Sequence, residues 1–404
     1  MKKLSTCVRV ATVYGLVATL LGCGGGSSSS TPPAQNAVTV GQQNGAYGAV
    51  GQSVSVSWSN TQDVACTGSG ALAGTLSASG TQAVTLTTEG ATTFTVTCGN
   101  ASQSATITTL PQYTVIPDPV FEQALVAMGI DDVVDGHVLT ANILKVTKMA
   151  ILGGSGYQQA ADVKTAATGN AYITSATGLE NFRNLTYLRF EQQKVAAFDL
   201  STLTELTWLS LWQEPITAID LSHNTALETL GLSETSLTSV DVSMFPDLSE
   251  LDLQNAEGTT LPYTTPTGAM VQGLTSIDVS KNPKLGLLDV SANRLTTLDV
   301  SHNPVLQTIW GEYNDFTSLN FSGMASLHQV EISNNSDLIY LNLTGTGVAK
   351  QGGQLSTGNS PKLLQITVDN GAVSAAWCTA TPTFAYASSG VCQIDSTTTF
   401  ISGS

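Results

Sequence analysis

A leucine that recurs at a fixed interval constrains the fold of this chain more than any other feature. The interval is 21 residues from Leu185 through Leu206 and Leu227 to Leu248, stretches once to 37, and returns to 21 from Leu285 through Leu306 to Leu327. Apolar residues stand at the first and fourth positions of these units and, except in the unit at Leu306, at the sixth position; a second apolar triplet, around an Asp in most units, closes the unit. One unit cannot bury its own leucines, so the units must stack about 4.8 Å apart and share one apolar core.

The pattern LxxLxL followed by a turn, seen at residues 206–211, resembles the leucine-rich-repeat family. The resemblance implies a solenoid of parallel strands over residues 151–375, with about eight turns and a length of roughly 40 Å. Residues 363–368 are expected to form its degenerate last turn. Insertions at residues 152–172, 255–272 and 345–360 should leave the solenoid as loops at a repeat edge.

Three successive units carry Asn293, Asn314 and Asn335 at the ninth position. In the family that this chain resembles, an asparagine there hydrogen-bonds the turn backbone from within and forms a ladder. Earlier units have Gln193, Glu214 and Thr235 at this position. We therefore expect the asparagine ladder to be confined to the C-terminal half of the solenoid.

The segment before the repeats has the pattern of an amphipathic helix. Phe121, Leu125 and Met128 are spaced to share one helix face, with proline near the start and Gly129 at the end. The stretch resembles the helical N-terminal cap of internalin-like leucine-rich repeats. Residues 111–150 should therefore cover the open edge of the first repeat.

Residues 37–110 alternate apolar and small polar residues in short runs, which predicts an all-β sandwich. The segment resembles small immunoglobulin-like modules of bacterial surface proteins, and Trp58, Cys66 and Cys98 match their order. In antibody domains the tryptophan follows the first cysteine, so the resemblance implies the sandwich and nothing about recognition. We expect this module to act as a stalk.

The N-terminus has the plan of a secretory signal over residues 1–22: a basic start, an apolar run of 12 residues and small residues before Cys23. Spanning a bilayer takes about 20 apolar residues, so a transmembrane helix is not expected. Residues 20–23 resemble the lipobox of bacterial lipoproteins, which implies that Cys23 receives a lipid. An ordinary soluble secretory signal with a chance cysteine is the alternative. Residues 23–36, rich in Gly, Ser and Pro, should form a flexible tether.

Gly24 stands where lipoproteins kept at the inner membrane usually have Asp, so the resemblance implies a lipid anchor in the bacterial outer membrane, facing outward or into the periplasm. The four cysteines that remain are Cys66, Cys98, Cys378 and Cys392. Three pairings are possible, but proximity in the sequence favours Cys66 with Cys98 and Cys378 with Cys392. The second bond would link a C-terminal cap over residues 376–404, in an oxidising compartment.

The net charge of −16 argues against nucleic acid or an anionic membrane surface as partner, because phosphate binding needs clustered Lys and Arg. The sequence has no GxSxG, phosphate-loop or HExxH motif, so we predict no enzyme and no cofactor. His223 and His302 share one repeat position, which indicates a role in the turn.

A column of aspartates recurs with the repeat at Asp199, Asp220, Asp241, Asp278 and Asp299. Stacked carboxylates repel, so each should face solvent and accept hydrogen bonds from nearby Ser, Thr or backbone N–H groups, or the column should bind calcium. Residues 131–136 also resemble a calcium-binding EF-hand loop. Val133 replaces an oxygen ligand there, and Asn142 stands where a bidentate Glu belongs, which favours a polar turn. We predict no metal site.

Residues between the strand leucines should point away from the core and form the exposed face of the parallel sheet. The predicted ligand-binding residues on this face are Tyr187, Arg189, Trp208, Trp212, Glu250, Asp252, Trp310 and Glu312. The same face should carry Glu191, Ser210, Asp289 and Glu331. Exposed aromatics beside carboxylates are typical anchors of protein or sugar recognition. In the alternative, the insertion loops bury the indoles.

The sequence thus predicts a mainly β, non-enzymatic surface protein that binds a protein ligand through this face and contacts membrane only through its anchor. The rival hypothesis is a module that binds a surface polysaccharide by stacking the same tryptophans on sugar rings. Salt should separate the two, because acidic contacts to a protein weaken with ionic strength and ring stacking does not.

Overall fold

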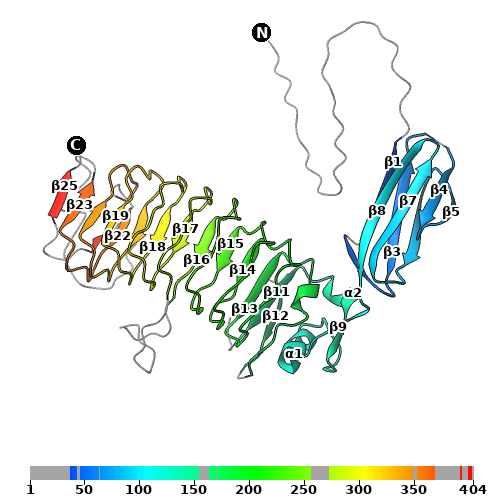
Figure 1. The fold of residues 1–404 in the computed structure, drawn as a ribbon, viewed down its shortest axis with the longest axis horizontal. Coiled ribbons are helices and arrows are strands. Elements are labelled where there is room, and N and C mark those ends of the chain that lie inside the picture. Colours follow the sequence, from blue (N-terminus) through cyan, green and yellow to red (C-terminus); the bar gives the residue numbers. More distant parts are fainter. Residues whose placement is uncertain are drawn as a thin grey trace, which may run out of the picture.

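The computed structural model describes residues 37–42, 46–62, 64–153, 163–169, 171–255, 273–348 and 353–368, and the backbone of residues 392–393 and 399–402. Within these residues the chain is mainly β (Figure 1). Most strands belong either to a pair of sheets near the N-terminus or to a long stack of parallel strands.

The N-terminal part consists of two sheets that share one core. One contains β1 (Val38–Gln42), β3 (Ser53–Asn60) and β6 (Ser79–Thr85). The other contains, in order, β2 (Tyr47–Ala49), β8 (Ala101–Leu110), β7 (Gly90–Cys98), β4 (Cys66–Gly70) and β5 (Gly74–Leu76). Val56 and Trp58 of the first sheet pack in one buried cluster with Phe94 and Ile107 of the second. The likeness to immunoglobulin modules stays a prediction.

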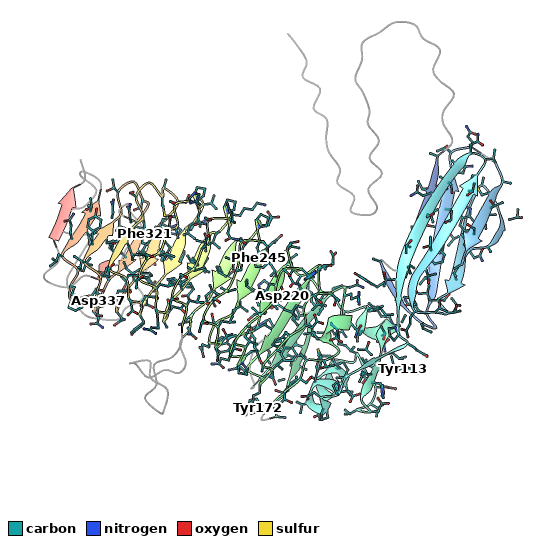
Figure 2. All side chains as sticks on the ribbon, viewed as in Figure 1. Tyr113, Tyr172, Asp220, Phe245, Phe321 and Asp337 are labelled. Atoms are coloured by element: carbon teal, nitrogen blue, oxygen red, sulfur yellow. A yellow bond between two sulfur atoms is a disulfide. The ribbon has the colours of Figure 1, made fainter. Side chains whose placement is uncertain are left out.

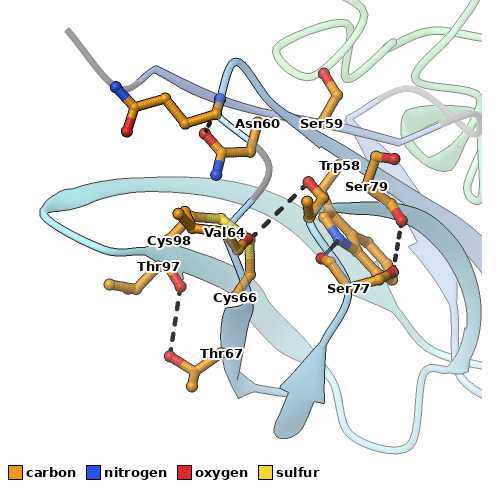
Figure 3. The surroundings of a disulfide bond; sticks show 12 residues. Trp58, Ser59, Asn60, Val64, Cys66, Thr67, Ser77, Ser79, Thr97 and Cys98 are labelled. Atoms are coloured by element: carbon orange, nitrogen blue, oxygen red, sulfur yellow. Dashed lines mark hydrogen bonds between the residues drawn. A yellow bond between two sulfur atoms is a disulfide. The ribbon is translucent and has the colours of Figure 1, made fainter.

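A disulfide bond joins Cys66 to Cys98, as the spacing of the cysteines predicted (Figure 3). It links β4 to β7, neighbouring strands of one sheet, where the two residues face each other in register with Cα atoms 4.2 Å apart. Nearby, the buried indole of Trp58 donates a hydrogen bond to the carbonyl oxygen of Ser77 at 3.0 Å. The predicted bond between Cys378 and Cys392 lies outside the described residues.

The segment before the repeats contains the predicted helix, α1 (Pro119–Ala127), with β9 (Tyr113–Val115), β10 (His137–Leu139) and α2 (Thr140–Ile143). Asp118 caps α1 through one carboxylate oxygen, which accepts the N–H groups of Val120 and Phe121. The other oxygen of Asp118 accepts the N–H groups of Thr174 and Ser175 at 2.8 and 3.1 Å. One side chain therefore both starts the helix and ties it to the chain just before the first leucine repeat.

The stack contains one long parallel sheet. Its strands, in order, are β12 (Lys164–Ala167), β11 (Lys148–Leu152), β13 (Tyr187–Glu191), β14 (Trp208–Ser210), β15 (Thr229–Gly231), β16 (Glu250–Asp252), β17 (Leu287–Asp289), β18 (Thr308–Trp310), β20 (Gln329–Glu331), β22 (Gln354–Ser356) and β24 (Cys392–Gln393). A shorter parallel sheet contains β19 (Ser318–Asn320), β21 (Tyr340–Asn342), β23 (Gln365–Val368) and β25 (Thr399–Ser402). A 3₁₀ turn, η1 (Leu179–Asn181), precedes β13.

The register of the long sheet confirms the repeat. Leu188 lies opposite Leu209 and Leu209 opposite Leu230, one interval of 21 residues apart. Where the interval is 37, Leu251 still lies opposite Leu288, so the extra residues do not disturb the pairing. These leucines are fully buried in a single cluster that runs through the stack, together with phenylalanines such as Phe245 (Figure 2).

The structure corrects two boundaries. Residues 164–167, inside the first predicted insertion, form the edge strand β12 and pair in parallel with β11. Residues 363–368 do not form the last turn of the long sheet: β23 belongs to the shorter sheet, and residues 354–356, predicted as part of an insertion, supply strand β22 of the long sheet. Residues 363–368 were assigned to the wrong sheet because each turn of the stack carries two apolar triplets with LxxLxL-like spacing. Residues 338–343 are an example of the second triplet, which supplies the shorter sheet.

The predicted asparagine ladder is present at Asn293, Asn314 and Asn335, all buried. The amide nitrogen of Asn314, for example, donates to the carbonyl oxygens of Val290 and Gly311, and its amide oxygen accepts the N–H of Leu295. A second ladder was not predicted. The amide nitrogens of Asn224, Asn282 and Asn303 each donate to two carbonyl oxygens of an earlier turn. Its sequence signal was the Asn that follows His223 and His302.

Candidate functional site

The side chains that point away from the leucine core define the outward face of the long sheet. They come from the third, fifth and seventh positions of each repeat, which alternation places opposite the buried fourth and sixth positions. All eight predicted binding residues stand at these positions. The indoles of Trp208, Trp212 and Trp310 are half-buried.

Two aromatic rings stack at the third position of neighbouring repeats. The ring centroids of Tyr187 and Trp208 lie 4.3 Å apart with 17° between their planes. The two residues face each other in register on β13 and β14, so the rings stack along the sheet. Because Tyr187 covers one side of the indole, the other side of Trp208 faces the small residue Thr229 on β15.

Arg189 and Glu191 form a fixed ion pair beside these rings. The guanidinium donates to both carboxylate oxygens of Glu191, at 2.8 and 2.6 Å, and the hydroxyl of Ser210 donates to the same carboxylate at 2.5 Å. Glu191 is only 3% exposed and Ser210 is 7% exposed. Both were predicted to be exposed, but side chains on strands about 4.8 Å apart crowd one another even on the outward face.

An open hollow of about 470 Å³ lies on the outward face over β13 to β16. On one side it is lined by Trp208, Trp212 and Arg189, and on the other by Glu250 and Asp252. Gly231 and the small side chains of Ser210, Thr229 and Ser233 lie between them, and Glu191, Leu230, Glu234 and Gln254 complete the lining. A Cβ added at Gly231 would have its nearest contact with the Ser210 hydroxyl at 3.5 Å, so the space above this residue is open.

A row of carboxylates continues from the hollow toward the C-terminal strands. Asp252 and Asp289 face each other in register on β16 and β17. Burial raises the pKa of Asp252, and burial and the neighbouring Asp252 raise the pKa of Asp289 to about 7. Burial, and then the charge of Glu331, raise the pKa of Glu312. Asp289 is only 7% exposed, although it was predicted on the exposed face.

The predicted residues therefore fall into two groups, with Tyr187 beside the first through its stacking on Trp208. Arg189, Trp208, Trp212, Glu250 and Asp252 line the hollow. Trp310 and Glu312 belong to β18 and the residues after it, two strands beyond β16, with β17 between.

The hollow itself was not predicted from sequence. The sequence pattern that marks the hollow appears only when the fifth positions of neighbouring repeats are compared. At this position Gly231 stands between Ser210 and Asp252.

Another recurring feature lines the edge of this site. The eighth position of the repeat adopts a left-handed backbone at Gln192, Gln213, Glu234, Ala292, Tyr313, Asn334 and Asn359, with φ between 54° and 61°. The amide of Gln192 donates to Gln213 at 2.9 Å, and the amide of Gln213 donates to Glu234. The left-handed residue makes a sharp turn that ends the strand. The polar side chains at this position form a hydrogen-bonded row in addition to the two asparagine ladders.

The aspartate column has a turn geometry. One carboxylate oxygen of each of Asp199, Asp220, Asp241, Asp278 and Asp299 accepts the N–H of the serine two residues later. Hydrogen bonds from these serines are the largest cause of the lowered pKa of each carboxyl. This arrangement is the first of the two predicted alternatives.

The EF-hand-like loop is also organised around hydrogen bonds. The N–H groups of Asp135, Gly136 and His137 all donate to one carboxylate oxygen of Glu122 in α1, at 2.7 to 3.0 Å. The loop therefore turns its backbone donors toward a buried carboxylate, as a polar turn does.

Across the described ranges, no group of three or more His, Cys, Asp and Glu side chains is placed to hold a metal ion. In the same ranges, no helix combines the length and the apolar character needed to cross a membrane.

No protein-family model matches the chain, and no curated protein matches its sequence. Among solved structures, the functional domain of InlJ from Listeria monocytogenes, described as including a cysteine ladder, is similar with a TM-score of 0.43 and 21% identity, over 64% of this chain and 58% of that domain. The chain thus spans less than two thirds of the InlJ domain. An internalin, InlF, from Listeria monocytogenes is similar with a TM-score of 0.35 and 17% identity, over 63% of this chain and 89% of InlF. The leucine-rich repeat domain of APL1B is similar with a TM-score of 0.25 and 20% identity, over 49% of this chain and 71% of that domain.

Proposed function

We propose that this chain is a non-enzymatic interaction protein that binds a protein ligand through the outward face of its long sheet. The observation that carries the proposal is the hollow, where half-buried indoles lie beside carboxylates on a rigid stack of strands. Large aromatic side chains at a solvent-facing surface are typical of the central contacts of protein interfaces. The parallel strands hold these side chains in place before a partner arrives, which lowers the entropy lost on binding.

Two features favour a protein ligand over the rival polysaccharide. The rings of Tyr187 and Trp208 cover one face of each other, so fewer ring faces are free to stack on sugars. The outward face from β14 to β20 also carries five carboxylates, at Glu250, Asp252, Asp289, Glu312 and Glu331. Charge of one sign is suited to a partner of opposite charge.

We further propose that the chain is held at the bacterial outer membrane by lipid on Cys23, with the N-terminal module as a stalk. The support is the sequence of residues 1–36, which lie outside the described residues. Substitution Cys23→Ser should move the protein from the membrane fraction to the soluble fraction of cells, and should abolish labelling by a fatty-acid analogue. A variant that stays membrane-bound and labelled would contradict the anchor.

The binding proposal is tested with the mature chain and two matched variants. Trp208→Ala combined with Trp212→Ala removes the indoles of the hollow, whereas Tyr113→Ala removes an aromatic ring that is 50% exposed on β9, outside the long sheet (Figure 2). Pull-down from partner cells and a glycan array should yield a protein ligand whose affinity falls at least tenfold in the double variant. Tyr113→Ala should bind as the parent does.

Unchanged affinity of the double variant, with its fold intact by circular dichroism, would refute the proposed face. A polysaccharide ligand lost in the double variant and insensitive to salt would establish the rival function in place of the protein ligand.

A further inference from the structure

We propose that the hollow over β13 to β16 receives a cationic side chain, arginine or lysine, from a protein partner. This inference rests on the proposed function, because it names the chemistry that the outward face recognises. Three observations carry it: an open ring face, an excess of carboxylate, and empty space between the two.

The aromatic side of the hollow can accept a cation. Tyr187 covers only one side of the Trp208 indole, and the other side looks onto Thr229, whose side chain is too small to cover it. Trp212 lines the same hollow. The face of an indole attracts a guanidinium or ammonium group placed within about 6 Å of the ring centroid.

The lining of the hollow has more carboxylates than basic groups. The hollow is lined by four carboxylates and one guanidinium, and that guanidinium is held by Glu191. Glu250 is exposed, and the half-buried Asp252 faces Asp289 on the next strand. Burial raises the pKa of Asp252, with a smaller contribution from the charge of Glu191, and burial followed by the charge of Asp252 raises the pKa of Asp289; a bound cation would relieve this repulsion.

The space between the two sides is shaped by the absence of a side chain at Gly231. Its φ is not in the left-handed region, and an added Cβ would make only ordinary contacts with Ser210. The fold therefore does not require glycine here, and a larger residue could occupy the position. The effect of glycine is to leave room between Trp208 and Asp252 for a side chain from outside.

The hollow is tested with a probe that carries the predicted group. The probe is a capped nonapeptide, Gly-Ser-Arg repeated three times, and its control contains citrulline in place of each arginine, which keeps the shape and removes the charge. Binding to the mature chain is followed by tryptophan fluorescence at low ionic strength. The arginine peptide should bind and the citrulline peptide should bind at least fivefold more weakly.

Two variants should weaken binding of the arginine peptide at least fivefold. Glu250→Gln with Asp252→Asn removes the charge, and Gly231→Leu fills the space. The matched control is Asp220→Asn with Asp241→Asn, because these exposed carboxylates stand at the repeat position that forms β19 in a later turn, away from the long sheet. The control changes the net charge equally, and it should leave the affinity within twofold of the parent.

Equal weakening by both charge variants would overturn the inference, since the peptide would then sense only the overall negative charge of the chain. Equal binding of the citrulline peptide, or no binding of the arginine peptide up to millimolar concentration, would overturn it as well. The two proposals can be told apart. If the Trp208 and Trp212 double variant loses the partner protein while the Glu250 and Asp252 double variant still binds it, the outward face is retained as the binding surface and the cationic side chain is excluded.

Discussion

Glu214 offers a sharp test of how the solenoid is stabilised. It occupies the ninth position of its repeat, where later repeats have asparagine, and its side chain is fully buried. Its two carboxylate oxygens accept the N–H groups of Gln193 and Val195 at 2.7 and 3.0 Å. Burial raises its pKa from 4.5 to about 8, although these two hydrogen bonds act to lower it.

The sign of the pH effect follows from this shift. Below about pH 4.5 the carboxyl is protonated in both the folded and the unfolded chain, and the folded state bears no cost. As the pH rises toward 8, the unfolded chain releases the proton while the folded chain retains it, so stability falls. A shift from 4.5 to about 8 corresponds to at most about 5 kcal/mol, reached at and above pH 8.

Glu214→Gln should remove this cost. A glutamine amide provides both an acceptor and a donor, as Gln193 does one repeat earlier, where its oxygen accepts the N–H of Ile173 and its nitrogen donates to the carbonyl of Glu191. Because the amide has a single acceptor oxygen, the N–H of Gln193 or of Val195 loses its acceptor, so urea unfolding at pH 4.5 should find the variant less stable than the parent by about 1 to 3 kcal/mol. Between pH 4.5 and pH 8 the difference in the free energy of unfolding should shift in favour of the variant by roughly 2 to 4 kcal/mol.

The control for this prediction is Asp220→Asn, because hydrogen bonds to Ser222 lower the pKa of this exposed carboxyl. Its replacement should not stabilise the chain as the pH rises. Parallel stability curves for Glu214→Gln and the parent between pH 4.5 and 8 would refute the reasoning about the buried carboxyl.

Three further predictions concern stability. Leu230→Ala, at a fully buried position of β15, should cost about 2 to 5 kcal/mol in urea unfolding, and a cost below about 1 kcal/mol would contradict the shared leucine core. Asn314→Ala leaves buried carbonyl and N–H groups without their side-chain partner and should cost about 1 to 3 kcal/mol, whereas a neutral result would show that the ladder contributes nothing. Replacing Cys66 and Cys98 with serine should destabilise the N-terminal module by about 3 kcal/mol and leave the unfolding of the repeats unchanged; a shift in both transitions would show that they unfold together.

Much of the fold was predictable because the repeat is periodic in the sequence. Leucines spaced by 21 residues come into register in parallel strands, and strand alternation then fixes which side chains, such as Trp208, face outward. The same periodicity led to a wrong placement of residues 363–368, because apolar triplets with the same spacing supply strands to both parallel sheets.

The candidate site was less predictable, because its shape depends on neighbours in other repeats. Glu191 is buried by Arg189 and Ser210, a pairing that no single strand reveals. The hollow depends on the contrast between Gly231 and the larger residues one repeat away on either side. Such contrasts are visible only once the register between the strands is known.

The most direct test of the outward face as the binding surface is site-specific photo-crosslinking in intact cells. A benzophenone amino acid is placed at Thr229, which lines the hollow, or at Ser239, an exposed residue at the repeat position that forms β19 in a later turn. Thr229 should crosslink to a partner protein, the arginine peptide should compete for it, and Ser239 should not crosslink. Crosslinks from Ser239 but not from Thr229 would contradict the outward face as the binding surface.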